Sequence, residues 1–288
     1  MSQPSRHPGA LFRESLQNGP VSVPGVFNAL SARMAERAGF RAVYQSGAAL
    51  SAGLSAVPDV GLITCEEFAE QARYLTQAVN IPVISDADTG FGKIPDVEQT
   101  VVQYEAAGLA GLHLEDQQFP KRCGHLSGKQ LVSVNEMTGK LQAAVAAKSN
   151  PDFVIIARTD ARAVDGLEAA VDRALSYVEA GADMIFPEAL ETPDEFALFA
   201  EQMNVPLIAN MTEFGKSPLL SVSELGEMGY AAVLFPVTLF RVAMKAVENA
   251  LAQLSAEGTQ QNFVDQMQTR AELYDLLDYD VSVSEKDQ

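Results

Sequence analysis

A cysteine stands beside cations in the segment KRCGH (residues 121–125), whose residue types could donate a proton and bind an anion. The segment follows Glu115 and Asp116, which close an apolar run at residues 111–114. A thiol next to Lys and Arg is expected to have a lowered pKa, and glycine lets a loop approach a ligand closely. We therefore predict a reactive loop around Cys123, although a solvated basic loop with an incidental cysteine would have the same composition.

The composition narrows the classes of protein to consider. At 288 residues with a 47% hydrophobic fraction, the chain can form one large domain with a substantial core. The net charge of −18 and the lack of a basic stripe argue against a nucleic-acid partner. No apolar run reaches the ~18 residues of a membrane span, and the first residues contain no secretory signal. The two cysteines, Cys65 and Cys123, are too few for a disulfide framework. We expect a reduced, cytoplasmic protein that binds a small molecule, with no membrane partner.

Short apolar runs rich in β-branched residues alternate with amphipathic segments that end in glycine. Gly39, Gly108, Gly181 and Gly229 stand where helix C-cap glycines are expected, and a strand follows each one. The runs are apolar throughout, which suits parallel strands buried on both faces. The pattern predicts an α/β fold, a (β/α)8 TIM-type barrel. An open doubly wound sheet is the alternative, but no GxGxxG motif follows the first strand. The expected strands are 23–26, 42–46, 83–86, 111–114, 153–158, 184–186, 207–210 and 232–235.

The C-terminal part contains more helical sequence than eight βα units require. We expect a single domain over residues 1–288, with the barrel at about 20–240, a helical arm at about 241–280 and an acidic tail at 281–288. The apolar residues of the arm need a partner surface. That surface is either the chain's own barrel or a neighbouring subunit.

Polar residues follow most of the predicted strands, and barrel active sites lie at the C-terminal ends of their strands. A single Asp or Asn at such a position is more often a cap or a solvated residue, but the joint pattern predicts a polar ring around one opening. The carboxylates Asp59, Asp86, Asp88 and Glu115 have no nearby Cys/His pair, so they suit a hard cation. We expect Mg²⁺, with Mn²⁺ as the alternative, bound directly by one carboxylate and through water by the others.

These residues resemble the signatures of the isocitrate lyase/phosphoenolpyruvate mutase superfamily over about residues 8–279. The matching segments are YQSG (44–47), DADTGFG (86–92), ED (115–116) and KRCGH (121–125). The cysteine resembles the carbon–carbon lyases of the superfamily rather than its mutases. The resemblance implies a Mg²⁺-dependent enzyme and a homotetramer that exchanges C-terminal helices between subunits. Ala48 departs from the family, which often has a second glycine there, but its backbone N–H remains.

Within the lyases, the chain most resembles the methylisocitrate lyase branch. Phe186, Leu234 and Pro236 match the apolar positions that accept the additional methyl group. The resemblance implies cleavage of the tricarboxylate (2R,3S)-2-methylisocitrate to pyruvate and succinate, in the methylcitrate cycle of propionate catabolism. A sister lyase acting on isocitrate, dimethylmalate or a related 2-hydroxy acid is the runner-up. A non-enzymatic barrel that binds organic acids is the remaining alternative.

The resemblance also implies roles for individual residues. Cys123 would protonate the succinate carbanion, with His125 and Arg158 as further catalytic residues. Tyr44 is the first candidate for the general base, and a metal-bound hydroxide is the second. A closing loop is implied because bulk water would quench the carbanion. The substrate would be bound by Ser46, Gly47, Ala48 and Arg158 at the pyruvate end and by Gly124, His125, Glu188, Asn210, Thr212 and Arg241 at the succinyl end.

Overall fold

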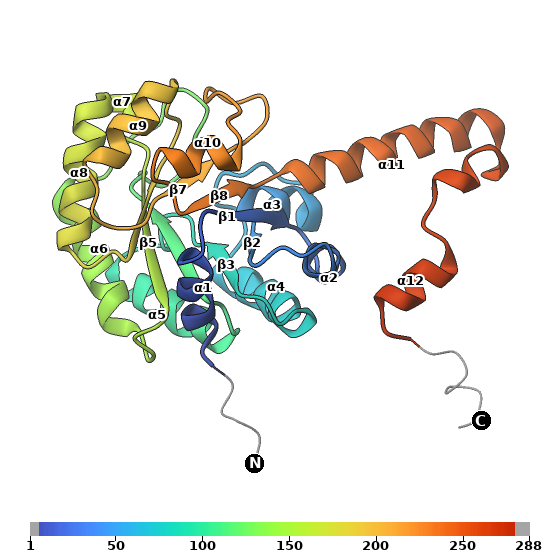
Figure 1. The fold of residues 1–288 in the computed structure, drawn as a ribbon, viewed down its shortest axis with the longest axis horizontal. Helices are drawn as coiled ribbons and strands as arrows, with labels where there is room; N and C mark the ends of the chain where they lie inside the picture. The colour runs from blue at the N-terminus through green and yellow to red at the C-terminus, as the bar shows by residue number, and fades with distance from the viewer. Residues whose placement is uncertain (1–5, 280–288) are drawn as a thin grey trace, which may run out of the picture. The chain divides into compact units, whose positions relative to one another are not determined.

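Eight parallel strands form the centre of the computed structural model, which describes residues 6–279 (Figure 1). They pair in the order β6-β5-β4-β3-β2-β1-β8-β7, and a parallel bridge between Ile185 and Leu207 joins the two outer strands. The sheet is therefore a nearly closed barrel, which confirms the (β/α)8 prediction over the open sheet. The strands are β1 (Val21–Val26), β2 (Val43–Gln45), β3 (Val83–Asp86), β4 (Gly111–Glu115), β5 (Val154–Thr159), β6 (Met184–Pro187), β7 (Ile208–Asn210) and β8 (Ala232–Phe235).

Helices surround the strands, and local sequence signals determine where many of them start and stop (Figure 1). Thr64 caps α4 and Ser221 caps α10, each accepting a hydrogen bond from the backbone N–H three residues later. Gly39, Gly108 and Gly181 have φ values of 88°, 85° and 100°, the left-handed conformation predicted for C-cap glycines. The helices are α1 (Pro8–Leu16), α2 (Ala29–Arg37), α3 (Gly47–Ser55), α4 (Cys65–Ala78), α5 (Ile94–Ala106), α6 (Val134–Ala147), α7 (Arg162–Asp165), α8 (Leu167–Glu179), α9 (Pro193–Glu201) and α10 (Val222–Glu227).

Buried apolar side chains form two clusters, one inside the barrel and one between the strands and the helices. The inner cluster includes Ile84, Ile156 and Leu234, while the outer cluster includes Leu112 and Leu114. Phe12 of α1 belongs to the inner cluster and is fully buried. Arg13 donates a hydrogen bond to the carbonyl of Asp152, which precedes β5, so α1 covers the end of the barrel where strands begin.

The chain divides into two compact units at residues 239 and 240. The second unit contains most of α11 (Thr238–Glu257), a 3₁₀ helix (Gln261–Gln266) and α12 (Arg270–Leu276). Helix α11 carries exposed apolar residues, among them Val242, Val247 and Leu251. The exchange of this arm between subunits stays a prediction, and the acidic tail predicted at 281–288 lies outside the described residues.

Across residues 6–279, no helix combines the length and the apolar character needed to cross a membrane.

Candidate active site

The polar side chains at the strand ends point to the inside of the barrel. Successive residues of a strand point to opposite sides, and Leu112 and Leu114 of β4 lie in the outer cluster. His113 and Glu115 therefore point inward. The parallel register places Asp86 beside His113 and Glu115 beside Arg158. The same alternation makes the side chains at the ends of the other strands point into the barrel. They include Glu188 after β6 and Asn210 at the end of β7.

Lys121 connects the predicted metal-binding carboxylates. Its Nζ lies 2.5 Å from Asp59 Oδ1 and forms a second ion pair with Asp88. The backbone N–H of Asp88 donates a 2.9 Å hydrogen bond to Asp86 Oδ1. Burial raises the pKa of Asp88 to about 7, Lys121 opposes this rise, and the carboxylates of Asp86 and Asp59 add to it. The sequence indicated Lys121 only as a cation near the cysteine, so its position as the counter-ion of this cluster was missed.

The buried carboxyl group of Glu115 lacks hydrogen-bond donors. Among the described residues, neither of its oxygens accepts a hydrogen bond, and the nearest cationic nitrogen is Arg158 Nη1 at 3.4 Å. Burial raises the pKa of Glu115 well above its ordinary value. Acceptors of this kind would be satisfied by the coordinated water of a hydrated cation.

The donor set fits a magnesium ion that keeps most of its water. No three His, Cys, Asp or Glu side chains within residues 6–279 are arranged to hold a metal together. Mg²⁺ commonly binds one or two carboxylates and retains several waters. Asp88 would hold the ion directly, and Asp59, Asp86 and Glu115 would bind its water. This division of direct and water-mediated ligands stays a prediction.

Tyr44 and His113 form a buried pair inside the barrel. The Tyr44 hydroxyl oxygen lies 2.9 Å from His113 Nε2, which in turn lies 3.6 Å from Asp86 Oδ1. Burial lowers the pKa of His113 to about 4, so the imidazole is neutral at pH 7. Burial and the Asp86 carboxylate raise the pKa of Tyr44 well above its ordinary value. Tyr44 thus has a proton acceptor in contact, while its burial opposes ionisation. The sequence analysis missed His113, whose only signal is its inward position in the run GLHLE.

Arg158 is the central cation of the site. Its Nε donates a 3.0 Å hydrogen bond to Asp160 Oδ2, and its Nη2 donates a 3.2 Å bond to Asp160 Oδ1. Glu188 Oε2 lies 3.6 Å from Arg158 Nε, and the Phe186 ring lies under the guanidinium at 5.3 Å. The bidentate pair with Asp160 fixes the orientation of the guanidinium. A guanidinium held in one orientation is well suited to bind a substrate carboxylate. Asp160 was not predicted as a site residue, although it follows Arg158 by two positions.

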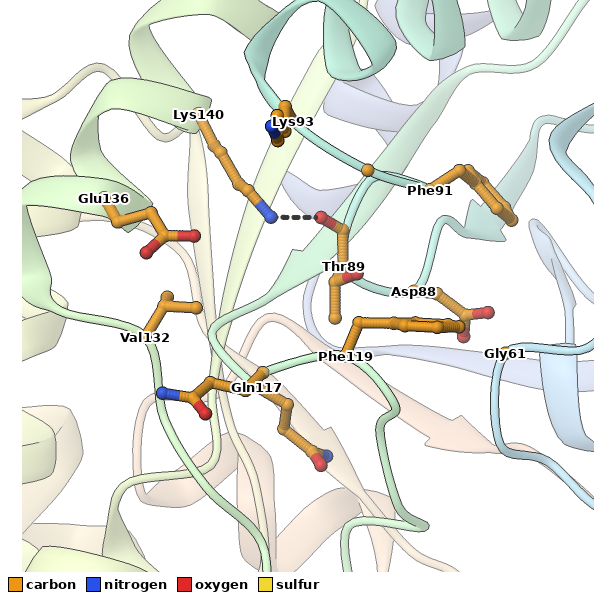
Figure 2. Close-up of a pocket in the computed structure, with 12 residues that line it drawn as sticks. Gly61, Asp88, Thr89, Phe91, Lys93, Gln117, Phe119, Val132, Glu136 and Lys140 are labelled. Carbon is orange, nitrogen blue, oxygen red and sulfur yellow. Dashed lines mark hydrogen bonds between the residues drawn. The ribbon is translucent and has the colours of Figure 1, made fainter.

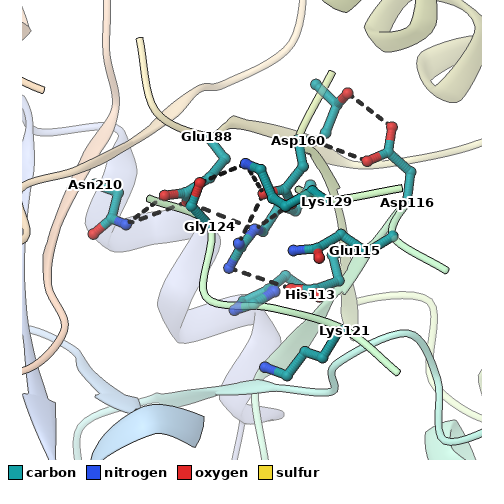
Figure 3. Close-up of polar contacts among 12 residues, drawn as sticks. His113, Glu115, Asp116, Lys121, Gly124, Lys129, Asp160, Glu188 and Asn210 are labelled. Carbon is teal, nitrogen blue, oxygen red and sulfur yellow. Dashed lines mark hydrogen bonds and ion pairs between the residues drawn. The ribbon is translucent and has the colours of Figure 1, made fainter. Parts of the chain in front are cut away.

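The cysteine loop (residues 121–129) lies directly against these groups, as Figure 3 shows. A Cβ atom at Gly124 would lie 2.4 Å from Arg158 Nη2 and 2.6 Å from Glu188 Cδ. His125 Nε2 lies 2.8 Å from Glu188 Oε1, and Asn210 Nδ2 donates to both Glu188 oxygens at 3.3 and 3.2 Å. The structure therefore brings together Gly124, His125, Glu188 and Asn210, which were predicted to meet. Thr212 is partly buried two residues after β7, and Arg241 belongs to the second unit.

The predicted lowering of the Cys123 pKa is wrong. Burial is the largest influence and raises the pKa of the thiol, and the Glu188 carboxylate raises it further. A backbone hydrogen bond with His125 and the charge of Arg158 only partly oppose this rise. The adjacent guanidinium of Arg122 instead donates to the carbonyl of Ser127 at 3.3 Å. A thiol that keeps its proton suits an acid better than a nucleophile.

The N-terminus of α3 supplies the predicted backbone donors. Ser46 caps this helix by accepting a 3.3 Å hydrogen bond from the N–H of Ala49. A Cβ atom at Gly47 would lie 2.4 Å from Asp86 Oδ2, so a larger residue cannot occupy this position without displacing the carboxylate. The first-turn N–H groups, including that of Ala48, are suited to an anion because the helix dipole favours negative charge there. They lie next to the carboxylate cluster that Asp86 contributes to.

The three predicted apolar residues belong to β6 and to β8 and its end, with β7 between the two strands. Phe186 and Leu234 both belong to the inner cluster. The Phe186 ring meets the His113 ring edge-on, with centroids 5.3 Å apart. Pro236 follows β8, and its carbonyl lies where a Cβ at Gly25 would be. Phe186 thus contacts functional groups, while contact of the three residues with a methyl group stays a prediction.

Two cavities adjoin the site. One of about 620 Å³ lies along the cysteine loop and is lined by Asp59, Lys121 and Cys123. The other, of about 510 Å³, reaches Asp88 from the side of α6 (Figure 2). There the buried Lys140 donates a 2.9 Å hydrogen bond to the carbonyl of Thr89 and so supports the turn that carries Asp88. Both cavities lead to the carboxylate cluster.

The barrel, the carboxylate cluster and the cysteine loop define a superfamily. The chain belongs to the isocitrate lyase/phosphoenolpyruvate mutase superfamily, since the family described as phosphoenolpyruvate phosphomutase matches residues 12–255. Within it, a 2-methylisocitrate lyase of Aeropyrum pernix is 51% identical over 96% of this chain and 89% of the relative. A 2-methylisocitrate lyase of Escherichia coli (strain K12) is 45% identical over 94% of this chain and 93% of the relative.

Solved structures of the same superfamily share the fold. A 2,3-dimethylmalate lyase matches with a TM-score of 0.89 and 34% identity, over 95% of this chain and 92% of that chain. A phosphonopyruvate hydrolase in complex with oxalate and Mg²⁺ matches with a TM-score of 0.85 and 34% identity, over 94% of both chains. Enzymes with this architecture therefore act on different small organic acids.

Proposed function

We propose that the protein is a Mg²⁺-dependent carbon–carbon lyase that cleaves (2R,3S)-2-methylisocitrate to pyruvate and succinate. The observation that carries the proposal is the contact of Gly124 with Arg158 and Glu188, because it places the adjacent Cys123 thiol at the mouth of a site rich in carboxylate-binding groups. The 2-methylisocitrate lyases at 45 and 51% identity support this substrate. The two free thiols support a reducing cytoplasm as the location.

The pyruvate end of the substrate would lie near the carboxylate cluster. Asp88 would hold Mg²⁺ directly, with Asp59, Asp86 and Glu115 acting through water. The bound ion supplies Lewis-acid stabilisation of the negative charge that develops on the substrate oxygens. The N-terminal N–H groups of α3 and the guanidinium of Arg158 bind the pyruvate carboxylate.

The reaction needs one proton removed and one delivered. Tyr44 takes the proton of the tertiary hydroxyl as it passes its own phenolic proton to His113 Nε2, 2.9 Å away. The phenol thus stays neutral, as its raised pKa favours. The alkoxide electrons form the ketone of pyruvate as the C2–C3 bond breaks, and the bonding pair moves into the succinate fragment. The Cys123 thiol delivers its proton to that fragment. Its raised pKa keeps the proton in place until the carbanion forms.

The succinyl end would be bound under the cysteine loop. Glu188 is itself anionic, so it acts by orienting His125, Arg158 and Asn210 rather than by contacting the substrate carboxylates. Thr212 and Arg241 complete the proposed set. Phe186, Leu234 and Pro236 would surround the additional methyl group, for which an apolar pocket supplies about 1–3 kcal/mol of discrimination.

Measuring the 2-oxo acid released tests the proposal, because 2-methylisocitrate and 2,3-dimethylmalate give pyruvate whereas isocitrate gives glyoxylate. Purified protein is assayed with 2-methylisocitrate, isocitrate and 2,3-dimethylmalate, with Mg²⁺ or with EDTA. We expect rapid pyruvate formation from 2-methylisocitrate that EDTA abolishes and Mg²⁺ restores. Faster cleavage of 2,3-dimethylmalate or isocitrate would replace the proposed substrate, and no turnover of any acid would indicate a binding protein.

A further inference from the structure

Lys129 is a buried lysine at the end of the cysteine loop whose neighbours are exposed. Gly128 and Gln130 are both exposed, whereas Lys129 is only 6% exposed. Its Nζ donates a hydrogen bond to the carbonyl oxygen of Gly124 and a 2.7 Å bond to Asp160 Oδ1 (Figure 3). Lysine is rarely buried unless it is paired. The two bonds therefore join the end of the loop to its centre and to the barrel.

Asp160 is shared between the loop and the central arginine. Its carboxylate is fully buried and accepts hydrogen bonds from Lys129 and from two nitrogens of Arg158. Its backbone N–H donates a 2.8 Å bond to Asp116 Oδ1, so the residue that follows β4 holds it in place. One rigid anion thus orients both Arg158 and the loop lysine.

The position of Gly124 determines where the thiol lies. Its Cα is in direct contact with Arg158 and Glu188, and its carbonyl oxygen is bound by Lys129. Cys123 precedes Gly124, so a shift of this carbonyl moves the thiol relative to Arg158. Another contact of the loop, that of His125 with Glu188, involves groups already assigned to the substrate site.

We propose that Lys129 is a positioning residue that latches the cysteine loop to Asp160, and that Asp160 thereby couples the placement of the Cys123 thiol to the orientation of Arg158. The role as an acid-positioning latch rests on the proposed lyase function, but the latch itself is a property of the resting protein. Without the ammonium group, the Gly124 carbonyl loses its bond to Lys129, and Asp160 keeps only Arg158 as a cationic partner within residues 6–279.

Alkylation of Cys123 by iodoacetamide, without substrate, measures the latch. Rates are followed by peptide mass spectrometry and corrected for the thiolate fraction obtained from their pH profile. We expect Lys129→Met to accelerate Cys123 labelling by about 10- to 100-fold, the effect of losing one hydrogen bond to a charged group. Lys129→Arg keeps the cation and should label more slowly than Lys129→Met.

Two internal comparisons separate a latch from general loosening. Lys148 also bonds a backbone carbonyl, that of Phe153, and an aspartate, Asp183, but on the far side of the barrel from the loop. Lys148→Met should leave Cys123 labelling unchanged. The buried Cys65 reports global opening and should label at the wild-type rate in every variant.

Wild-type labelling of Cys123 in Lys129→Met, with Cys65 still protected, would overturn the latch. If Cys65 labelling showed that Lys129→Met unfolds, Asp160→Asn would give the decisive rate, since it removes the charge that Lys129 pairs with, and an unchanged Cys123 rate there would equally overturn it. A protein that fails to cleave 2-methylisocitrate but labels as expected would refute the proposed substrate and leave the latch standing. In active protein, Lys129→Met should lower kcat more than it raises KM.

Discussion

His125 Nε2 lies 2.8 Å from Glu188 Oε1, so the loop that carries Cys123 is tied to the residue that follows β6. The opposite nitrogen, Nδ1, accepts a 3.0 Å hydrogen bond from the backbone N–H of Lys216. Because Nδ1 is an acceptor, Nε2 is the nitrogen that carries the proton and lies close to the carboxylate. Two segments far apart in sequence meet at this ring, which fixes the loop over the ends of β5, β6 and β7.

Cys123→Ser should reduce kcat by about 10²- to 10⁴-fold, the contribution typical of a positioned acid. A hydroxyl is a much weaker acid than a thiol, while Mg²⁺ and pyruvate binding should persist because the carboxylates and Arg158 are intact. Steady-state kinetics and calorimetric titration with pyruvate check this. Cys65→Ser is the control, because Cys65 is buried against Thr100 and Gln103 away from the loop and should keep wild-type kcat. Near wild-type turnover of Cys123→Ser would remove the thiol from the mechanism.

Asp88→Ala should abolish Mg²⁺-dependent turnover and most Mg²⁺ affinity. Asp59→Ala and Glu115→Ala should be milder, with losses of about 10–100-fold, because water-mediated groups usually contribute that much. Calorimetric Mg²⁺ titration gives a readout independent of activity. If Asp88→Ala bound Mg²⁺ as tightly as the wild type, the direct ligand would have to be one of the other carboxylates.

Glu188 should make stability depend on pH in acid. Although burial opposes it, the charge of Arg158 and the contact with the His125 ring hold the pKa of Glu188 well below its ordinary value of 4.5. A carboxyl group with a lowered folded-state pKa contributes stability that is fully present above its unfolded-state pKa and lost as the pH falls. The wild type should therefore exceed Glu188→Gln in free energy of unfolding at pH 7, and the difference should shrink as the pH falls below 4.5. Urea unfolding between pH 7 and 3 measures it, and a constant difference would contradict the assignment.

The matched control for that titration is Glu195→Gln. Burial opposes it, but hydrogen bonds from Arg162 and from the backbone N–H of Glu191 together lower the pKa of Glu195, the same direction as for Glu188. The Glu195 side chain is partly exposed, and such ion pairs contribute less. Its substitution should change the pH dependence of stability less than Glu188→Gln does.

Methylisocitrate should be preferred over isocitrate by roughly 10- to 200-fold in kcat/KM, the range that one methyl group in an apolar pocket can supply. Leu234→Phe adds volume to the inner cluster that also contains Phe186 and should reduce this preference by excluding the methyl group. Progress curves for both substrates with wild type and variant provide the ratio. Equal specificity constants in the wild type would defeat the assignment of the methyl pocket and favour a broader lyase.

Removal of the chain from Gly258 onward should give smaller species with little activity. The proposed homotetramer exchanges C-terminal helices, and the exposed apolar residues of α11 require a covering surface in such an assembly. Sedimentation velocity of the full chain and the truncated chain at micromolar concentration measures the assembly. An active monomer of the full chain would contradict helix exchange.

The strand positions could be predicted because they follow from local periodicity. Each predicted strand overlaps an observed one, and the C-cap glycines Gly39, Gly108 and Gly181 have the expected positive φ. The alternation of side chains along a strand also predicts which residues point inward. Ile156 belongs to the inner cluster, so Arg158, two residues later in the same strand, points to the same side. Such patterns depend only on residues close in the chain.

Features that depend on distant contacts were not predictable. Lys129 stands in the polar stretch SGKQ, which is typical of a solvated loop, yet it is buried and paired with Asp160, which follows β5. Neighbouring cations suggested an acidic thiol at Cys123, but the sequence does not reveal that folding encloses the loop. The Tyr44–His113 contact likewise joins β2 to β4 across 69 residues of sequence.

The pairing of the cations at the mouth also affects how fast a substrate can arrive. Lys121, Lys129 and Arg158 are each bound to carboxylates, and the whole chain has a net charge of −18. A tricarboxylate therefore meets a repulsive field until it is close enough to compete for Arg158. Screening weakens that repulsion over a Debye length of about 8 Å at physiological ionic strength. We expect moderate salt to accelerate encounter, the reverse of the behaviour of enzymes that attract their anions from a distance.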